Sequence, residues 1–157
     1  MEMVYIASYK GIRPGWHGIV NRIIRTLDST EYSHTEVCIG NPFENVVPCY
    51  SASGVDKGVR VKYMKLDPEN WDVICVPFVY DEEVIRLYNR TAGHPYDYFG
   101  TGRFAFPWML REHPYKYFCS EWAGEAMKIE GPWRLSPATI KNIGLSMGGY
   151  EVYPLKD

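Results

Sequence analysis

The chain has 157 residues, a formal net charge of −2 and a hydrophobic fraction of 46%. This length suits one domain, and the balance of apolar and charged residues excludes a disordered tail, a collagen-like repeat and a coiled coil. The charge balance does not favour a nucleic-acid partner, because nucleic-acid binders usually carry a basic excess. We therefore expect a single domain over residues 1–157.

Strand patterns dominate the first half of the chain. Residues 3–9 predict a strand, and apolar side chains at helical spacing predict a helix over 16–27. Four further strands are expected at residues 32–40, 46–53, 59–64 and 71–78. The last of these is nearly continuous in apolar residues, which predicts a central position in the sheet.

The second half of the chain alternates between helices and irregular segments. A helix is expected over 81–92, with Asp81 as its cap and Gly93 at its end. Further helices are expected over 119–130 and, after Ser136-Pro137, to about residue 143, and 151–153 reads as an edge strand. Clustered strands with helices around them predict an α+β fold in which an antiparallel sheet packs against helices.

Cysteine usage and the N-terminal residues bear on the cellular compartment. The four cysteines form no CxxC pair and no dense cluster, so free thiols are expected rather than disulfides or a zinc site. No stretch has the roughly 18 apolar residues of a membrane span, and the first residues lack the pattern of a secretory signal. We expect a cytoplasmic protein without integral membrane association.

Two segments contain unusual polar residues. In the strand expected at 32–40, the apolar face holds Thr35, Val37 and Ile39, so His34 and Glu36 project together from the other face. That face either meets water or is covered. If it is covered, the imidazole and the carboxylate must be paired, because unpaired burial costs several kcal/mol.

The second segment begins the helix expected at 119–130. Cys119 opens this helix, where the helix dipole and free N–H groups stabilise a thiolate and could hold an oxyanion. The alternative is a buried structural cysteine, which is common in protein cores. A thiol at a helix start together with a histidine beside a polar neighbour meets the general requirement for a Cys–His nucleophile. Metal binding by His34, Cys38 and Cys119 is a further alternative, although their spacing matches no zinc pattern.

Five segments in order along the chain resemble a known family. They are Tyr32–Gly40, Tyr50–Ser53 with Gly58-Val59, Gly93–Tyr98, Tyr117–Glu121 and Leu135–Pro137. Together they are similar to the circularly permuted branch of the papain-like cysteine hydrolases. That branch includes NlpC-type relatives such as the YiiX/YaeF-like amidases and, more distantly, the lecithin retinol acyltransferase-like proteins. In it the histidine precedes the cysteine, as it does here.

The resemblance implies that Cys119 is the nucleophile, that His34 is its base, and that the helix after Cys119 packs on the sheet. Relatives often carry the third polar residue on the next strand, where this chain has Ser51. Glu36 is the better candidate on chemical grounds, because it shares a face with His34 and its carboxylate would raise the pKa of the histidine. Ser51 is the alternative third member. Asp97 is expected to organise its loop, as in relatives.

The expected function is hydrolysis of an amide, ester or thioester bond through an acyl-enzyme on Cys119, without a metal or cofactor. The substrate would be a peptide, an amide or a lipid-like molecule, and the aromatic segment 96–108 could line a cleft for it. A lipid acyltransferase is one alternative. The other is a non-catalytic binding or structural module on the same scaffold, because a fold does not fix a function. The resemblance also suggests a bacterial or phage origin.

Overall fold

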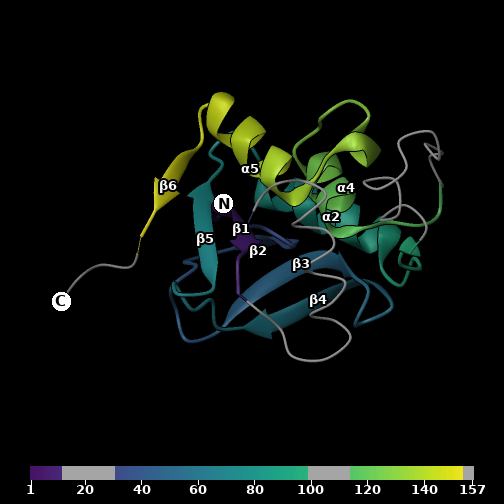
Figure 1. Ribbon diagram of the computed structural model, residues 1–157, viewed down its shortest axis with the longest axis horizontal. Coiled ribbons are helices and arrows are strands. Elements are labelled where there is room, and N and C mark those ends of the chain that lie inside the picture. The colour runs from purple at the N-terminus through teal and green to yellow at the C-terminus, as the bar shows by residue number, and fades with distance from the viewer. Residues whose placement is uncertain (12–30, 99–113, 154–157) are drawn as a thin grey trace.

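The computed structural model describes residues 1–11, 31–98 and 114–153. In these ranges, six strands form one antiparallel sheet in the order β4-β3-β2-β1-β5-β6 (Figure 1). The strands are β1 (Val4–Tyr9), β2 (His34–Ile39), β3 (Val47–Ser53), β4 (Gly58–Met64), β5 (Trp71–Cys75) and β6 (Tyr150–Val152). The α+β class with an antiparallel sheet is confirmed.

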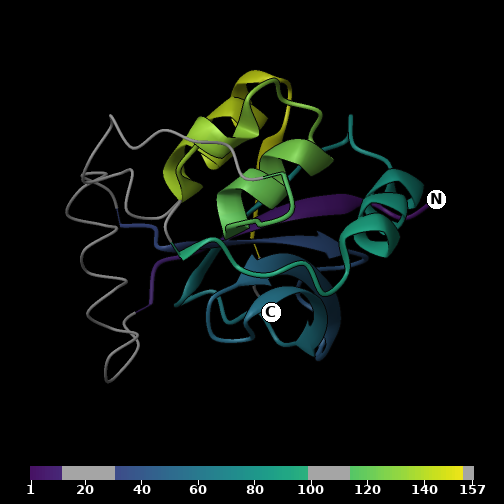
Figure 2. The same ribbon diagram turned by 90° about the vertical axis from the view of Figure 1, so that its right-hand side faces the viewer.

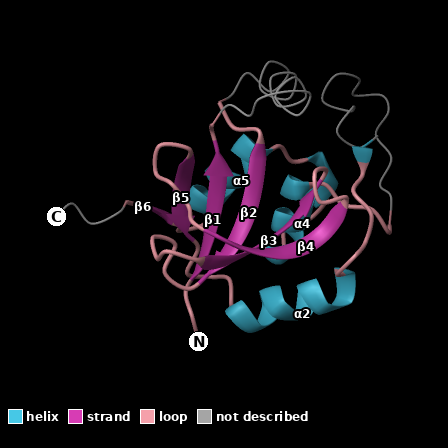
Figure 3. Cartoon of the chain, turned by 90° about the horizontal axis from the view of Figure 1, so that it is seen from below, coloured by secondary structure: helices cyan, strands magenta, loops and turns pink. Residues whose placement is uncertain are grey.

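The helices gather on one side of this sheet. They are α2 (Asp81–Thr91), α4 (Cys119–Ala126), the 3₁₀ turn η2 (Pro132–Arg134) and α5 (Pro137–Ser146). α4 packs on β2 and β3, and α5 packs on β1 and β5, so the two helices form one layer above the strands (Figures 1 and 2). α2 lies beside β4 at the margin of the sheet (Figure 3). No helix in the described ranges is both long enough and apolar enough to cross a membrane.

The sheet separates two apolar clusters. Side chains alternate across a strand, so Val37 and Ile39 of β2 join the cluster beneath the helices, while Cys38 joins the cluster on the opposite face. Trp122 and Ala123 anchor α4 in the helix-side cluster, and Trp71 belongs to the opposite one. This sorting confirms the predicted two faces of β2.

Several element boundaries differ from the predictions for identifiable reasons. β5 ends at Cys75 rather than at residue 78, because Pro77 has no backbone N–H to continue a ladder. α4 ends at Ala126 rather than at residue 130. There Lys128 takes a left-handed conformation, with φ of 58°, and the N–H groups of Lys128 and Ile129 bond back to Glu125 and Gly124. This is a Schellman-type helix end.

The helix starts and the remaining strands agree with the predictions in part. The Ser136 side chain accepts a hydrogen bond from Thr139 N and caps α5, which runs three residues further than the predicted end at 143. Asp81 was expected as the cap of α2 but is its first helical residue, after Tyr80. β6 is the edge strand expected near residue 151, whereas β5 lies next to it and is not central. The helix predicted over 16–27 lies outside the described residues.

Candidate active site

Cys119 is the first residue of α4 and is 5% exposed. The first N–H groups of a helix have no partners within it, so the start of α4 offers hydrogen-bond donors near Cys119. The start of α4 is held at two further points. Phe118 N donates to Glu121 Oε2 at 3.4 Å, and the Ser120 hydroxyl donates to Leu135 O at 2.6 Å. The helix start that carries Cys119 is therefore fixed to the segment before α5.

His34 is the first residue of β2, and its ring interacts with Glu36 and with Cys119. Nε2 lies 2.7 Å from Glu36 Oε1, and the Cys119 side chain is near enough to act on the titration of the ring. Burial lowers the pKa of His34, but the negative charges of Cys119 and Glu36 and the hydrogen bonds to both raise it to about 9.

Cys119 and Glu36 reach His34 from different layers of the molecule. Cys119 belongs to the helix layer, whereas Glu36 lies on the sheet face turned away from α4. His34 and Tyr9 form the last pair of the β1–β2 ladder, so the imidazole lies at the end of the sheet. A side chain at a strand end can be approached from both faces, which allows one ring to contact a helix start and a buried strand carboxylate.

Glu36 is 1% exposed, and a cation lies beside its carboxylate. Arg60 of β4 forms a bidentate pair with it, with Nη1 2.7 Å from Oε2 and Nη2 2.6 Å from Oε1. Burial raises the pKa of Glu36, but the neighbouring charges and hydrogen bonds of His34 and Arg60 lower it below its usual value. Glu36 is thus an ionised, buried acceptor for the histidine.

Arg60 was not identified from the sequence. The sequence did point to its partner, Glu36. Because a buried carboxylate requires a cation, a basic residue on the same sheet face was the signal that could have identified Arg60. The ladder supplies the position: β2 pairs with β3, and Ser51 of β3 pairs with Arg60 of β4. Arg60 also donates from Nε to Asp56 Oδ2 at 2.8 Å.

Ser51, the alternative third member, has its hydrogen bonds elsewhere. Its hydroxyl donates to the backbone oxygens of Thr35, at 2.7 Å, and Ala52, at 3.2 Å. Ser51 lies on the sheet face between the strands that carry Glu36 and Arg60. Its small side chain leaves room for the arginine to reach the carboxylate across β3. Glu36, rather than Ser51, is the residue that contacts His34.

The other residues considered from the sequence lie away from this contact. Cys38 Sγ is 3.2 Å from Cys49 Sγ in the cluster on the far side of the sheet, so the set His34, Cys38 and Cys119 does not converge. No group of three potential metal ligands gathers among the described residues. Asp97 is buried, and its N–H donates to Tyr117 O at 2.9 Å, which ties its loop to the residue before Phe118. Most of the aromatic segment 96–108 lies outside the described residues.

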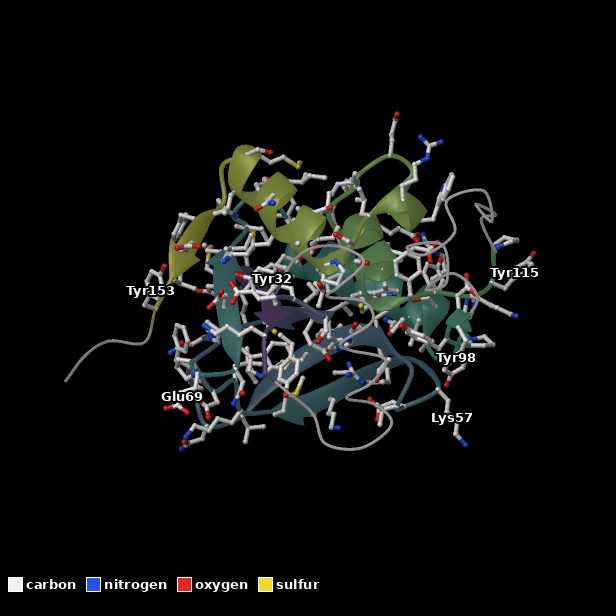
Figure 4. All side chains as sticks on the ribbon, viewed as in Figure 1. Tyr32, Lys57, Glu69, Tyr98, Tyr115 and Tyr153 are labelled. Carbon is white, nitrogen blue, oxygen red and sulfur yellow. The ribbon has the colours of Figure 1, made fainter. Side chains whose placement is uncertain are left out.

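A second polar cluster fixes the chain just before His34. The Tyr32 hydroxyl donates to the Asp72 carboxylate and accepts from Lys141 Nζ at 2.9 Å. Lys10 Nζ lies 2.7 Å from Asp72 Oδ1, and Lys141 Nζ lies 3.1 Å from Glu151 Oε1. Figure 4 shows Tyr32 between the sheet and α5, well away from Tyr98 and Tyr115. Because the residue after β1 and residues of β5, α5 and β6 all belong to this cluster, the start of β2 has a fixed position.

The arrangement has the parts of a nucleophilic site. A thiol at a helix start interacts with an imidazole, and a buried carboxylate bonds to Nε2 of the same ring. Such a chain can hold a proton on the ring while the sulfur carries a negative charge. No protein-family model matches this chain, and no curated protein matches its sequence.

Proposed function

We propose that this protein is a cysteine hydrolase that cleaves an amide, ester or thioester bond through an acyl-enzyme on Cys119. The contact of His34 with both Cys119 and Glu36 carries this proposal. The order of histidine and cysteine along the chain supports a relationship to the permuted papain-like hydrolases. Peptides, amides and lipid-like acyl compounds are the substrate classes to test.

The first half of the reaction forms the acyl-enzyme. His34 holds the proton of the Cys119 thiol, and the thiolate attacks the carbonyl carbon of the substrate. The carbonyl π electrons move to oxygen, and the backbone N–H of Cys119 with a neighbouring donor stabilises this oxyanion. When the carbonyl re-forms, the bond to the leaving group breaks. The amine, alcohol or thiol then leaves with the proton from His34, and Cys119 is left as a thioester.

The second half releases the acyl group. A water molecule attacks the thioester carbonyl and gives a proton to His34. Collapse of the second tetrahedral intermediate breaks the carbon–sulfur bond and releases a carboxylic acid. Glu36 keeps the ring oriented and favours the imidazolium form that arises in both halves, because an ionised carboxylate stabilises a neighbouring cation.

Labelling with a cysteine-directed acyl or peptide probe tests the nucleophile. We expect the wild-type protein to be labelled at Cys119 and Cys119→Ala to be unlabelled, with a strong loss in His34→Ala. Cys75→Ala is the matched control, because Cys75 is a fully buried thiol within a strand and its loss should leave labelling unchanged. Equal labelling of wild type and Cys119→Ala would refute the assignment.

A thioester or activated ester substrate then separates hydrolysis from the alternatives. Release of free acid with turnover supports a hydrolase. Transfer of the acyl group to an added amine or alcohol in preference to water would replace it with an acyltransferase. An unreactive Cys119 in the folded wild-type protein would leave a binding or structural module.

A further inference from the structure

We propose that Arg60 is a positioning residue that fixes Glu36 against His34, with Asp56 holding Arg60 from the outer side. This inference rests on the proposed function, because it concerns how the His34–Cys119 pair is maintained. It assigns a role to a series of interacting charged side chains. The series begins at the nucleophile, crosses from β2 past β3 to β4, and ends in the turn between β3 and β4.

The proposal rests on the geometry of the two hydrogen bonds between Arg60 and Glu36. Glu36 Oε2 accepts from Arg60 Nη1 at 2.7 Å, while Oε1 is shared between Arg60 Nη2, at 2.6 Å, and His34 Nε2, at 2.7 Å. Two parallel bonds from a planar guanidinium fix the plane of a carboxylate, which a single bond does not. With its plane fixed, Glu36 presents Oε1 to the histidine in one orientation.

Asp56 completes the restraint on Arg60. Arg60 Nε lies 2.8 Å from Asp56 Oδ2, so the guanidinium is bonded along its remaining edge. Asp56 N is itself 3.3 Å from the Ser53 hydroxyl, which anchors the turn. The Arg60 side chain is 17% exposed and the Asp56 side chain 30% exposed, so the chain of contacts runs from the interior toward the surface.

The signs of the charges alternate along these contacts. In the reactive form they are negative at Cys119, positive at His34, negative at Glu36, positive at Arg60 and negative at Asp56. Loss of the Arg60 charge would leave His34 as the one cation between two negative groups, Glu36 and the thiolate. Removal of a nearby cation favours protonation of its neighbours, so His34 would then keep its proton to higher pH.

Other titratable groups near this chain must be considered in the same argument. Cys38 on β2 and Cys49 on β3 face Glu36 and Arg60 from inside the sheet, where burial raises the pKa of Cys38 well above its ordinary value. Lys62 of β4 lies near Asp56 and is exposed. Tyr9 of β1 pairs with His34 across the ladder. Of these groups, only Lys62 is a cation, and it makes the matched control.

The test is the pH titration of the His34 imidazole protons, followed by NMR on the full chain. In wild type we expect a midpoint near pH 9, because the contacts of His34 raise its pKa to about 9. Arg60→Met should move this midpoint up by about 1 pH unit, because the loss of a nearby cation favours the protonated ring.

Three further variants separate positioning from general destabilisation. Arg60→Lys retains the charge but not the two parallel bonds to Glu36, so it should move the midpoint up by less than Arg60→Met does. Asp56→Asn removes a negative charge and should move the midpoint to lower pH, opposite to Arg60→Met. Lys62→Met removes a cation from the same strand but outside the chain of contacts, and should leave the midpoint unchanged.

The outcomes distinguish this inference from the proposed function. A Cys119 that the cysteine-directed probe does not label in wild type would refute the nucleophile itself. A labelled Cys119, combined with an unmoved His34 midpoint in Arg60→Met, would overturn only the role of Arg60. If Arg60→Met does not fold, Asp56→Asn and Arg60→Lys still test the proposal, because they should shift the midpoint in opposite directions. An unmoved midpoint in Asp56→Asn overturns the proposal.

Discussion

His34 Nε2 and Glu36 Oε1 lie 2.7 Å apart although the two residues belong to one strand. Residues at positions i and i+2 of a strand project from the same face, so the strand itself supplies the carboxylate beside the histidine. The counter-charge of Glu36 comes from Arg60 of β4. Ser51 of β3 lies between them and bonds to backbone oxygens instead of to the histidine.

Replacement of Ser51 tests the identity of the third member. Ser51→Ala loses hydrogen bonds to two backbone oxygens and should cost about 1 kcal/mol of unfolding free energy, with Cys119 labelling by the acyl probe within about twofold of wild type. Ser51→Val should be far more damaging, because its branched side chain would occupy the space through which Arg60 reaches Glu36. Urea unfolding and probe labelling measure both effects. A large loss of labelling in a folded Ser51→Ala would place Ser51 in the catalytic group.

The His34 titration can be followed directly by the NMR signals of its imidazole protons. The negative charges of Cys119 and Glu36 outweigh burial and raise the pKa of His34 to about 9. Cys119→Ser removes the thiolate charge, and Glu36→Gln removes the carboxylate charge, so each should lower this pKa. Ser146→Ala, which removes a hydroxyl from the exposed end of α5, should not. An unchanged His34 titration in Cys119→Ser would mean that the two groups are not coupled.

Glu36 should make the stability of the fold depend on acid pH. Its native pKa is below the ordinary value of 4.5, so its ionised form stabilises the folded state fully above about pH 4.5, and this contribution is lost as the pH falls through the native pKa. We expect Glu36→Gln to lose about 3 kcal/mol at neutral pH, because Arg60 would keep a buried charge without its main partner. The difference from wild type should shrink as the pH falls below about 4.5.

Urea unfolding at a series of pH values measures this difference. Glu69→Gln is the control, because Glu69 is exposed on the surface (Figure 4) and its replacement should change stability little at any pH. A gap between wild type and Glu36→Gln that stays constant down to strongly acid pH would show that the Glu36 charge is not what stabilises the fold.

Gly124 determines how closely α4 approaches the following helices. A Cβ at this position would lie 2.7 Å from Pro132 Cβ and 3.3 Å from Ile140 Cδ1. Gly124→Ala should therefore destabilise the protein by about 1–3 kcal/mol, although alanine is the better helix former. Thermal unfolding measures the change. A stabilised variant would mean that η2 and α5 can move away from α4 at little cost.

Much of the fold could be predicted from local patterns. Alternation placed β2 and sorted Val37 from Cys38, and the Ser136-Pro137 pair marked the start of α5. The ends of elements were less predictable. Lys128, rather than a glycine, takes the left-handed conformation that ends α4, and no residue preference signals this before the chain is folded.

Strand periodicity and local start signals are enough to predict that His34 and Glu36 share one face and that Cys119 begins a helix. The approach of the thiol to the imidazole at the end of the sheet, and the pairing of Arg60 with Glu36, become visible only in the folded chain. Both contacts join segments far apart along the chain. They depend on the register of the sheet and on the packing of α4 against β2 and β3. Residues distant in the sequence determine both features jointly.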